Sequence, residues 1–162
     1  MGASVVAIDM LLDFNSAYGE DPTLEDALAE TGNVLLVSQA EIEKGEYLGL
    51  NTAIDRFNDV TNHGYSNIAP NSAISESIVR LRIHREMVNL FDAWPFAVKA
   101  VSMSREEEPE LVNGVLSIGP EIEVQLDQFD EMYIDYPYLP GVSDRVSSLH
   151  EIIGISASDL LF

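Results

Sequence analysis

Two aspartates near the start of the chain are the residues best suited to catalysis or metal binding. Asp9 lies in the short apolar run Ser4–Met10, and Asp13 follows it closely. Ligands of open α/β sheets bind at the carboxyl ends of strands, where carboxylates act as acids, bases or Mg²⁺ ligands. A carboxylate there can also hydrogen-bond the next loop. Because the chain has 28 acidic residues, a coincidental pair is expected and the structural role is favoured.

Three arginines gather in one short stretch of this acidic chain. Arg80, Arg82 and Arg85 are three of the eight basic residues, and they lie within six positions. Guanidinium groups form paired hydrogen bonds with phosphates and carboxylates. The cluster could therefore hold an anionic ligand or pair with carboxylates of the chain itself. We favour internal pairing.

Histidines and short motifs do not indicate a metal or a cofactor. His63, His84 and His150 fall in three different predicted elements, and none has a second ligand at a spacing typical of metal sites. We interpret them as surface or capping residues. The sequence has no G-x-S-x-G, P-loop or G-x-G-x-x-G motif, which removes the usual arguments for acyl transfer, nucleotide hydrolysis and dinucleotide binding. We expect no catalytic residues, no metal and no cofactor.

The first 38 residues predict a strand, a helix and a second strand. Ser4–Met10 is rich in Val and Ile, as buried parallel strands are. Asp21 before Pro22 predicts a helix start at which the aspartate caps free N–H groups, and Gly32 predicts the end of that helix. Asn33–Ser38 is the second strand. A right-handed parallel crossover is expected to join the two strands.

The rest of the chain predicts shorter elements, which together give an α/β fold. The fold class is a mixed sheet with a parallel β-α-β start and antiparallel hairpins later, and with helices packed on the sheet. The last three strands would form two hairpins. The expected elements are a loop at Gly45–Gly49, a helix with Ala53, Ile54 and Phe57 that ends at Asn62–Gly64, strands at Tyr65–Ile68 and Ser77–His84, a helix that begins at Pro95 and turns Lys99 outward, strands at Val115–Ile118, Ile122–Leu126 and Met132–Tyr136, and a short helix after Ser147.

Length, charge and composition limit the classes of partner. The 162 residues suffice for one domain, and the net charge of −20 repels nucleic acid and anionic membrane surfaces. The absence of cysteine excludes disulfides and thiolate sites. Apolar runs are far shorter than the roughly 20 residues that span a bilayer. No signal peptide is expected within the chain.

Several segments, taken in order, resemble one known family. Their succession covers nearly the whole chain, although no single segment is as specific as a Walker loop. It resembles the second type of CHASE domain, the extracellular sensory module found in bacterial adenylate cyclases, histidine kinases and serine/threonine kinases. The segments are GASVVAIDMLL, DPTLEDALAETGNVLLVS, HGYSN, SIVRLRI, WPFAVKAV, MYIDYP and VSSLHEIIG.

The resemblance also implies that residues 1–162 are a single sensory domain lacking flanking elements at both ends. Such domains usually have a further strand and helix before the Gly-Ala-x-Val-Val-x-x-Asp segment and a further strand after the final short helix. Asn67 and Arg80 keep the positions of the family. The stretch Asn71–Glu76 departs from it, because it lacks the second aspartate and the glycine of the family's Asp-x-Asp-Gly turn.

The function implied by the resemblance is signal input without chemistry. A ligand or physical cue outside the membrane would alter this domain of a bacterial receptor. A transmembrane helix outside this chain would then pass the change to a cytoplasmic output domain, such as a cyclase or kinase. The expected location is extracytoplasmic. The expected ligand is a small molecule held near Asp9, Asn67, Arg80 and Tyr136, which are polar residues near strand ends.

Two alternative functions remain open, and we also expect a particular oligomeric state. The chain could be a small α/β enzyme that uses Asp9 and Asp13, or a ligand-independent dimerisation module. We also expect a homodimer, because receptors of this sort usually work as dimers. Missing flanking strands would moreover leave a sheet edge open. The expected contact surfaces are Ser4–Asp9 and Leu160–Phe162.

Overall fold

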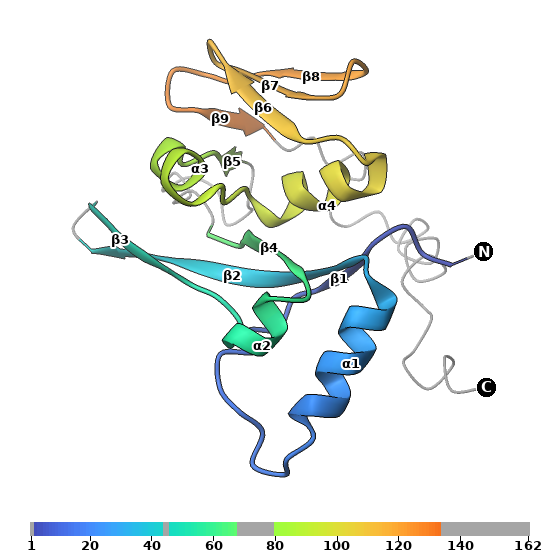
Figure 1. Ribbon diagram of the computed structural model, residues 1–162. Helices are drawn as coiled ribbons and strands as arrows, with labels where there is room; N and C mark the ends of the chain where they lie inside the picture. Colours follow the sequence, from blue (N-terminus) through green and yellow to red (C-terminus); the bar gives the residue numbers. More distant parts are fainter. Residues whose placement is uncertain (1, 44–45, 68–79, 134–162) are drawn as a thin grey trace, which may run out of the picture.

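The computed structural model describes residues 2–43, 46–67 and 80–133, and its first part is a four-stranded mixed sheet (Figure 1). The long strand β2 (Val34–Glu43) lies at its centre. The first half of β2 pairs in parallel with β1 (Val6–Ile8) on one side and with β4 (Asn62–Tyr65) on the other. The second half pairs antiparallel with β3 (Glu46–Asn51). The predicted α/β class with a parallel β-α-β start is confirmed.

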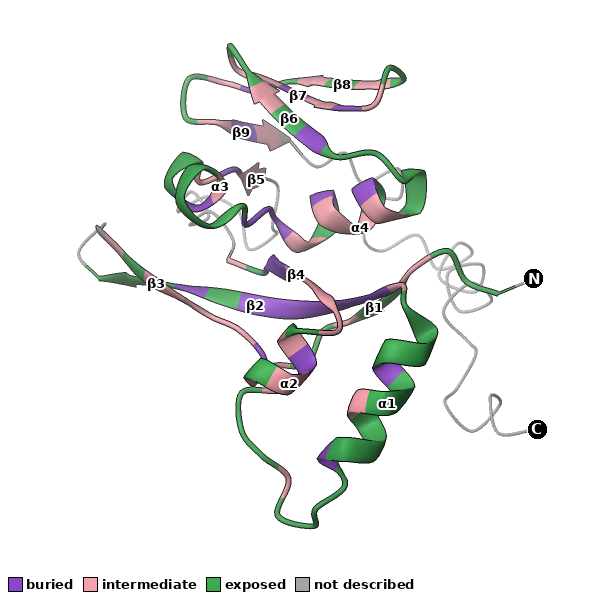
Figure 2. Cartoon of the chain, in the orientation of Figure 1, coloured by how far each residue is buried: buried purple, intermediate pink, exposed green. Residues whose placement is uncertain are grey.

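Helices cover both faces of this sheet. In Figure 1, α1 (Asp21–Thr31) and α2 (Asp55–Asn58) lie below it, and α3 (Arg85–Phe91) and α4 (Phe96–Arg105) lie above it. Below the sheet, Leu28 and Phe57 pack with Val34 and Leu36 of β2. Figure 2 shows that the first half of β2 is buried throughout, whereas most of α1 is exposed.

The ends of α1 agree with the sequence prediction, but the role of Asp21 does not. Gly32 ends the helix with a φ of 73°, a left-handed conformation that suits glycine, and its N–H donates to the Leu28 carbonyl. Asp21 is not the N-cap. It lies inside the first turn, and its two carboxylate oxygens accept the Ser16 N–H at 3.1 and 3.0 Å. The aspartate thus fastens the preceding loop rather than the helix end.

Three local predictions in residues 46–99 are wrong. Most of the expected loop at Gly45–Gly49 belongs to β3, because β2 runs on to Glu43 and forms a hairpin with it. His63 and Gly64 do not end a helix but form β4, where pairing with β2 outweighs the glycine signal. Lys99 does not point outward, since its side chain is only 12% exposed and its Nζ contacts a Glu108 carboxylate oxygen at 3.0 Å.

The second part of the structure contains two small antiparallel sheets. One sheet has the order β6-β7-β8, with β6 (Pro109–Val112), β7 (Val115–Ile118) and β8 (Ile122–Gln125). The other pairs β5 (Arg80–Arg82) with β9 (Glu131–Tyr133). The predicted hairpin of β7 and β8 is therefore confirmed, whereas a second hairpin with the strand near Met132 is wrong. The predicted short helix after Ser147 lies outside the described residues.

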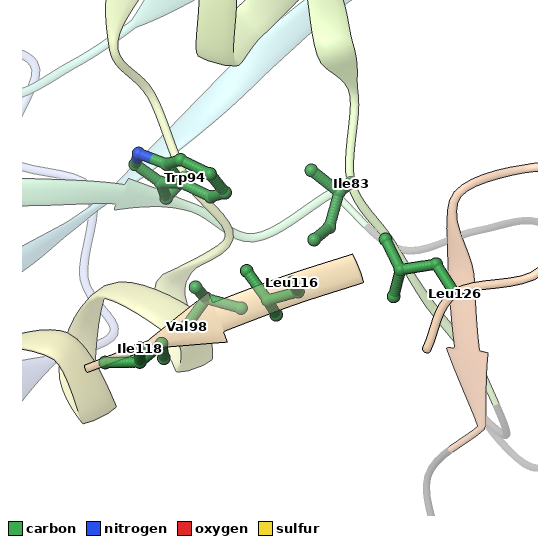
Figure 3. Close-up of a cluster of buried hydrophobic side chains, with 6 residues drawn as sticks. All are labelled: Ile83, Trp94, Val98, Leu116, Ile118 and Leu126. Carbon is green, nitrogen blue, oxygen red and sulfur yellow. The ribbon is translucent and has the colours of Figure 1, made fainter. Parts of the chain in front are cut away.

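An apolar core joins these sheets to α4 (Figure 3). Trp94 contributes from just before α4, Val98 from α4 itself, and Leu116 and Ile118 from β7. Ile83 and Leu126 complete the cluster. No helix in the described ranges combines the length and apolar character needed to cross a membrane.

Gly64 marks the closest approach of β4 to α4. A Cβ atom at this position would lie 2.7 Å from the Phe96 Cα and 3.1 Å from the Phe96 N, both backbone atoms that cannot rotate away. The neighbouring Tyr65 N–H donates to the Trp94 carbonyl at 3.0 Å, which fixes the approach. Only glycine fits here without a shift of the backbone.

We predict that Gly64→Ala lowers the free energy of unfolding by about 1–3 kcal/mol, because overpacking forces β4 and α4 apart. Urea unfolding followed by the fluorescence of Trp94, the one tryptophan of the chain, would measure this. Gly49→Ala is the control, since its Cβ would meet only a Glu41 side-chain oxygen at 3.6 Å. Equal stabilities of the two variants would contradict the prediction.

Candidate functional site

The polar centre of the second part is a carboxylate held by two arginines. Glu131 on β9 is 5% exposed, and its two oxygens contact Arg80 Nη1 at 3.1 Å and Arg82 Nη2. Both arginines lie on β5, where the antiparallel register places Arg82 opposite Glu131. Their side chains remain about a third exposed, at 36% and 34%. The pairing therefore lies at the border between the core and solvent.

A second ion pair continues this cluster. Arg85 Nε and Nη2 donate to the two carboxylate oxygens of Asp130, and this bidentate bond raises the pKa of Arg85. The Ile83 N–H also donates to the Asp130 carbonyl at 2.9 Å. We refer to Arg80, Arg82, Arg85, Asp130 and Glu131 as the ionic cluster. The predicted internal pairing of the three arginines is confirmed.

Tyr65 connects the ionic cluster to the four-stranded sheet. Its hydroxyl, at the end of β4, donates to the Arg82 carbonyl at 3.3 Å and accepts the His84 N–H at 3.0 Å. Its side chain is 1% exposed, and burial raises its pKa. The two hydrogen bonds of the Tyr65 hydroxyl hold the carboxyl end of β4 beside Arg82 at the end of β5 and His84 just after it.

Arg82 Nε is a buried donor with no acceptor among the described residues.

The four predicted ligand residues lie on different elements. Asp9 is exposed and directly follows β1. Asn67 follows β4, and Arg80 begins β5 in a separate sheet. Tyr136 lies outside the described residues. The contacts of Tyr65 bring β5 to the end of β4, whereas Asp9 is separated from β4 by β2.

Asn67 has a structural task in the sheet. Its Oδ1 accepts the Ala40 N–H at 2.6 Å, and its Nδ2 donates to the Ala40 carbonyl at 3.0 Å. The amide side chain thus continues the pairing of β4 with β2 past Tyr65, in place of a backbone segment. A ligand that bonded the Asn67 amide would loosen this junction.

Asp13 likewise has a partner in the chain. Its Oδ2 accepts a hydrogen bond from Asn51 Nδ2 at 3.3 Å, which ties the loop after β1 to the end of β3. Among the residues that the structure describes, no three His, Asp or Glu side chains are grouped so as to hold a metal ion. Asp13 therefore has a structural partner, but that partner lies at the end of β3 and not in the loop that follows β1.

The two described histidines are half-buried rather than freely exposed. His63 on β4 has its pKa lowered by burial and by Lys99, against an opposing effect of Asp92. The pKa of His84, the residue before α3, is lowered by burial and by Arg82. The His84 ring meets the Tyr65 ring edge-on, with centroids 5.7 Å apart. His84 makes no side-chain capping bond to α3.

Two open hollows on the described surface are lined by residues other than Asp9, Asn67 and Arg80. The first, of about 210 Å³, lies beside the β7–β8 turn. The second, of about 460 Å³, lies between the loop after β1 and α2, and is lined by Asn15, Ile54, Asp55 and Arg56. The residues lining the first are Arg105, Glu107, Ile118, Gly119, Pro120, Glu121 and Ile122.

Comparisons with protein-family models, with curated proteins and with solved structures found no match to this chain.

Asp130 and Glu131 are the site residues that sequence reasoning missed. They fall at a predicted turn and just before a predicted strand, where a carboxylate is unremarkable. Their partners are 45 to 51 residues away in sequence. The one available signal is the group of arginines at positions 80–85, which favours pairing with carboxylates of the chain but does not identify them.

We predict that Glu131→Gln lowers the free energy of unfolding by about 2 kcal/mol. The arginines lose their shared counter-charge, but their partial exposure keeps the cost below that of a fully buried pair. Urea unfolding would measure the change. Glu121→Gln is the control, because its ion pair with Arg105 is exposed on both sides and should cost less than about 1 kcal/mol. Similar losses of unfolding free energy in both variants would show that the ionic cluster stabilises the fold no more than an exposed ion pair does.

We also predict that His63 and His84 make stability fall as the pH drops. Both pKa values are lowered by folding from the ordinary 6.5. The unfolded chain therefore binds more protons, and the contribution is present above about pH 6.5 and lost below it. His63→Gln and His84→Gln should each reduce the difference in unfolding free energy between pH 7.5 and 5.5 by less than about 1 kcal/mol, since both rings remain partly solvated. An unchanged difference in the double variant would refute this.

Proposed function

We propose that this chain is the extracytoplasmic ligand-sensing domain of a bacterial transmembrane receptor, related to the second type of CHASE domain. It binds a small molecule without turnover, and the resulting conformational change passes to a cytoplasmic output domain. The observation that carries the proposal is the ordered succession of family-like segments along nearly the whole chain.

The fold supports this proposal by the places that the family-like segments occupy. The first two segments form the β1-α1-β2 unit, and HGYSN forms β4 and the residues after it. The segment SIVRLRI contains β5, and WPFAVKAV leads into α4, which packs on β4 and β2. Segments far apart in the sequence thus build one connected region around the end of β4.

The ionic cluster supports a route for conformational coupling. Strand β9 is held to β5 by backbone pairing and by the ion pairs of Glu131 and Asp130. Residues 134–162 directly follow β9. A ligand that loosens or tightens the pair β5–β9 therefore acts on the start of the C-terminal segment. Because Tyr65 joins β5 to β4, the same pair also responds to changes at the sheet.

We place the ligand at the carboxyl end of β4, near Asn67 and Arg80. Ligands of α/β sheets bind at such strand ends. The Asn67 amide and the Arg80 guanidinium offer donors there, although both already have partners in the chain. Asp9 lies at the end of β1, on the other side of β2 from β4. It would contact the ligand only if the ligand extended across the end of β2.

A thermal-shift screen of small metabolites, grouped as amino acids, sugars and organic acids, tests the proposal. One class should raise the unfolding temperature by roughly 5–10 °C at 100 times its dissociation constant, because only the folded state binds it. Asn67→Ala should weaken that shift, whereas Asn15→Ala, in the separate hollow near α2, should not. Mass spectrometry should recover the compound unchanged.

Two results would instead favour the alternatives. Consumption of the compound, with loss of turnover in Asp9→Asn, would favour an enzyme. A stable dimer with no ligand-dependent shift across the screen would favour a dimerisation module.

We further propose that the chain forms a homodimer through the outer edge of β1. Within the described ranges this strand pairs with β2 alone, and Val6 is 38% exposed. An unpaired edge offers backbone donors and acceptors to a second chain.

Sedimentation should show a dimer at high micromolar concentration, and Val6→Lys should shift it toward monomer. A monomeric wild-type chain would refute the proposal. The other expected contact, Leu160–Phe162, lies outside the described residues.

A further inference from the structure

The loop between β1 and α1, residues 9–20, exposes three large apolar side chains. Met10 is 60% exposed, Phe14 74% and Tyr18 86%, the highest value among the exposed large apolar residues. Figure 2 shows the loop as a green segment that projects beyond α2. Exposed apolar side chains concentrated in one segment mark interaction surfaces.

The same loop is fastened at several points, so these side chains are presented on a fixed scaffold. The Ile54 N–H donates to the Leu12 carbonyl at 2.9 Å. The Ser16 N–H donates to the Asp21 carboxylate, and the Tyr18 N–H donates to Ser16 Oγ at 3.1 Å. Leu12 turns inward and packs on the core under α1. The loop therefore packs Leu12 partly against the core while it leaves Met10, Phe14 and Tyr18 exposed.

The charge around the loop indicates what kind of partner would cover them. Residues 1–43 contain no Lys, Arg or His. Arg56, which lines the hollow beside the loop, already contacts Glu25 at 3.7 Å. Anionic lipid would be repelled by these carboxylates, and residues 1–43 of a second copy would offer them no cation. The nine acidic residues of this stretch are Asp9, Asp13, Glu20, Asp21, Glu25, Asp26, Glu30, Glu41 and Glu43.

We propose that Met10, Phe14 and Tyr18, with the adjoining hollow at Ile54, form a docking surface for a basic amphipathic segment of another protein. The aromatic side chains supply the buried contact area, and the surrounding carboxylates orient the cationic face of the partner. The open hollow of about 460 Å³ next to Asn15 offers the partner one apolar contact at Ile54 and one carboxylate at Asp55. This inference does not depend on the proposed sensing function.

The test uses the full chain and a fluorescent 18-residue amphipathic helix with one leucine face and one lysine face. Anisotropy should report micromolar binding that weakens with added salt. Phe14→Ser combined with Tyr18→Ser should weaken binding by about tenfold, as the loss of two interface anchors does. Leu90→Ser combined with Phe129→Ser is the matched control, since both residues are exposed but lie elsewhere, and it should bind as the wild type.

Three outcomes would overturn the proposal. Equal affinity of the loop variant and the wild type would show that net charge alone attracts the peptide. Equal affinity for a scrambled leucine/lysine peptide would show that an amphipathic face is not required. Loop-dependent binding to phosphatidylcholine vesicles, without binding to the peptide, would assign the loop to a membrane surface. Thermal unfolding of each variant confirms that the fold is retained.

Discussion

The burial of β2 is the constraint on which the rest of the first part depends. Leu35 and Leu36 are 0% and 1% exposed, and residues from Val34 to Ser38 are buried without interruption. Burying each leucine contributes about 1.5–3 kcal/mol, but only if both faces and both edges of the strand are covered. Strands β1 and β4 cover the edges, and α1, α2 and α4 cover the faces. Every later element of this part is positioned by that requirement.

The second part meets a different constraint, since a carboxylate is buried there as well as apolar residues. Glu131 is only 5% exposed, and an unpaired charge buried to that extent would be costly. Arg80 and Arg82 neutralise this charge. They are two residues apart on β5, so both side chains lie on the same face of the strand and reach one carboxylate. The register of β5 with β9 is consequently fixed by charge as well as by backbone bonds. The sheet-forming residues of such short strands would not specify it alone.

Sequence reasoning succeeded where the signal is local. The start of α1 at Pro22, its end at Gly32 and the hairpin of β7 with β8 follow from backbone preferences of single residues. It failed where tertiary pairing decides. The sequence predicts a helix end at Gly64, yet glycine is required there because β4 passes within contact of Phe96. The partner of β9 could not be inferred either, because the chain returns to β5 only after about fifty residues and no local pattern marks the return.

The distribution of charge connects the two parts to their proposed roles. Within residues 2–43, 46–67 and 80–133, each of the six lysines and arginines contacts a carboxylate. The cationic side chains of these residues thus form internal ion pairs, and the unpaired charges that remain are carboxylates. An anionic ligand at Arg80 would compete with Glu131 for that guanidinium, and this competition would couple binding to the pair β5–β9. A neutral ligand would bind there without this competition and would have to act through Asn67 and the end of β4. The two cases differ in salt dependence, because only the first exchanges one ion pair for another.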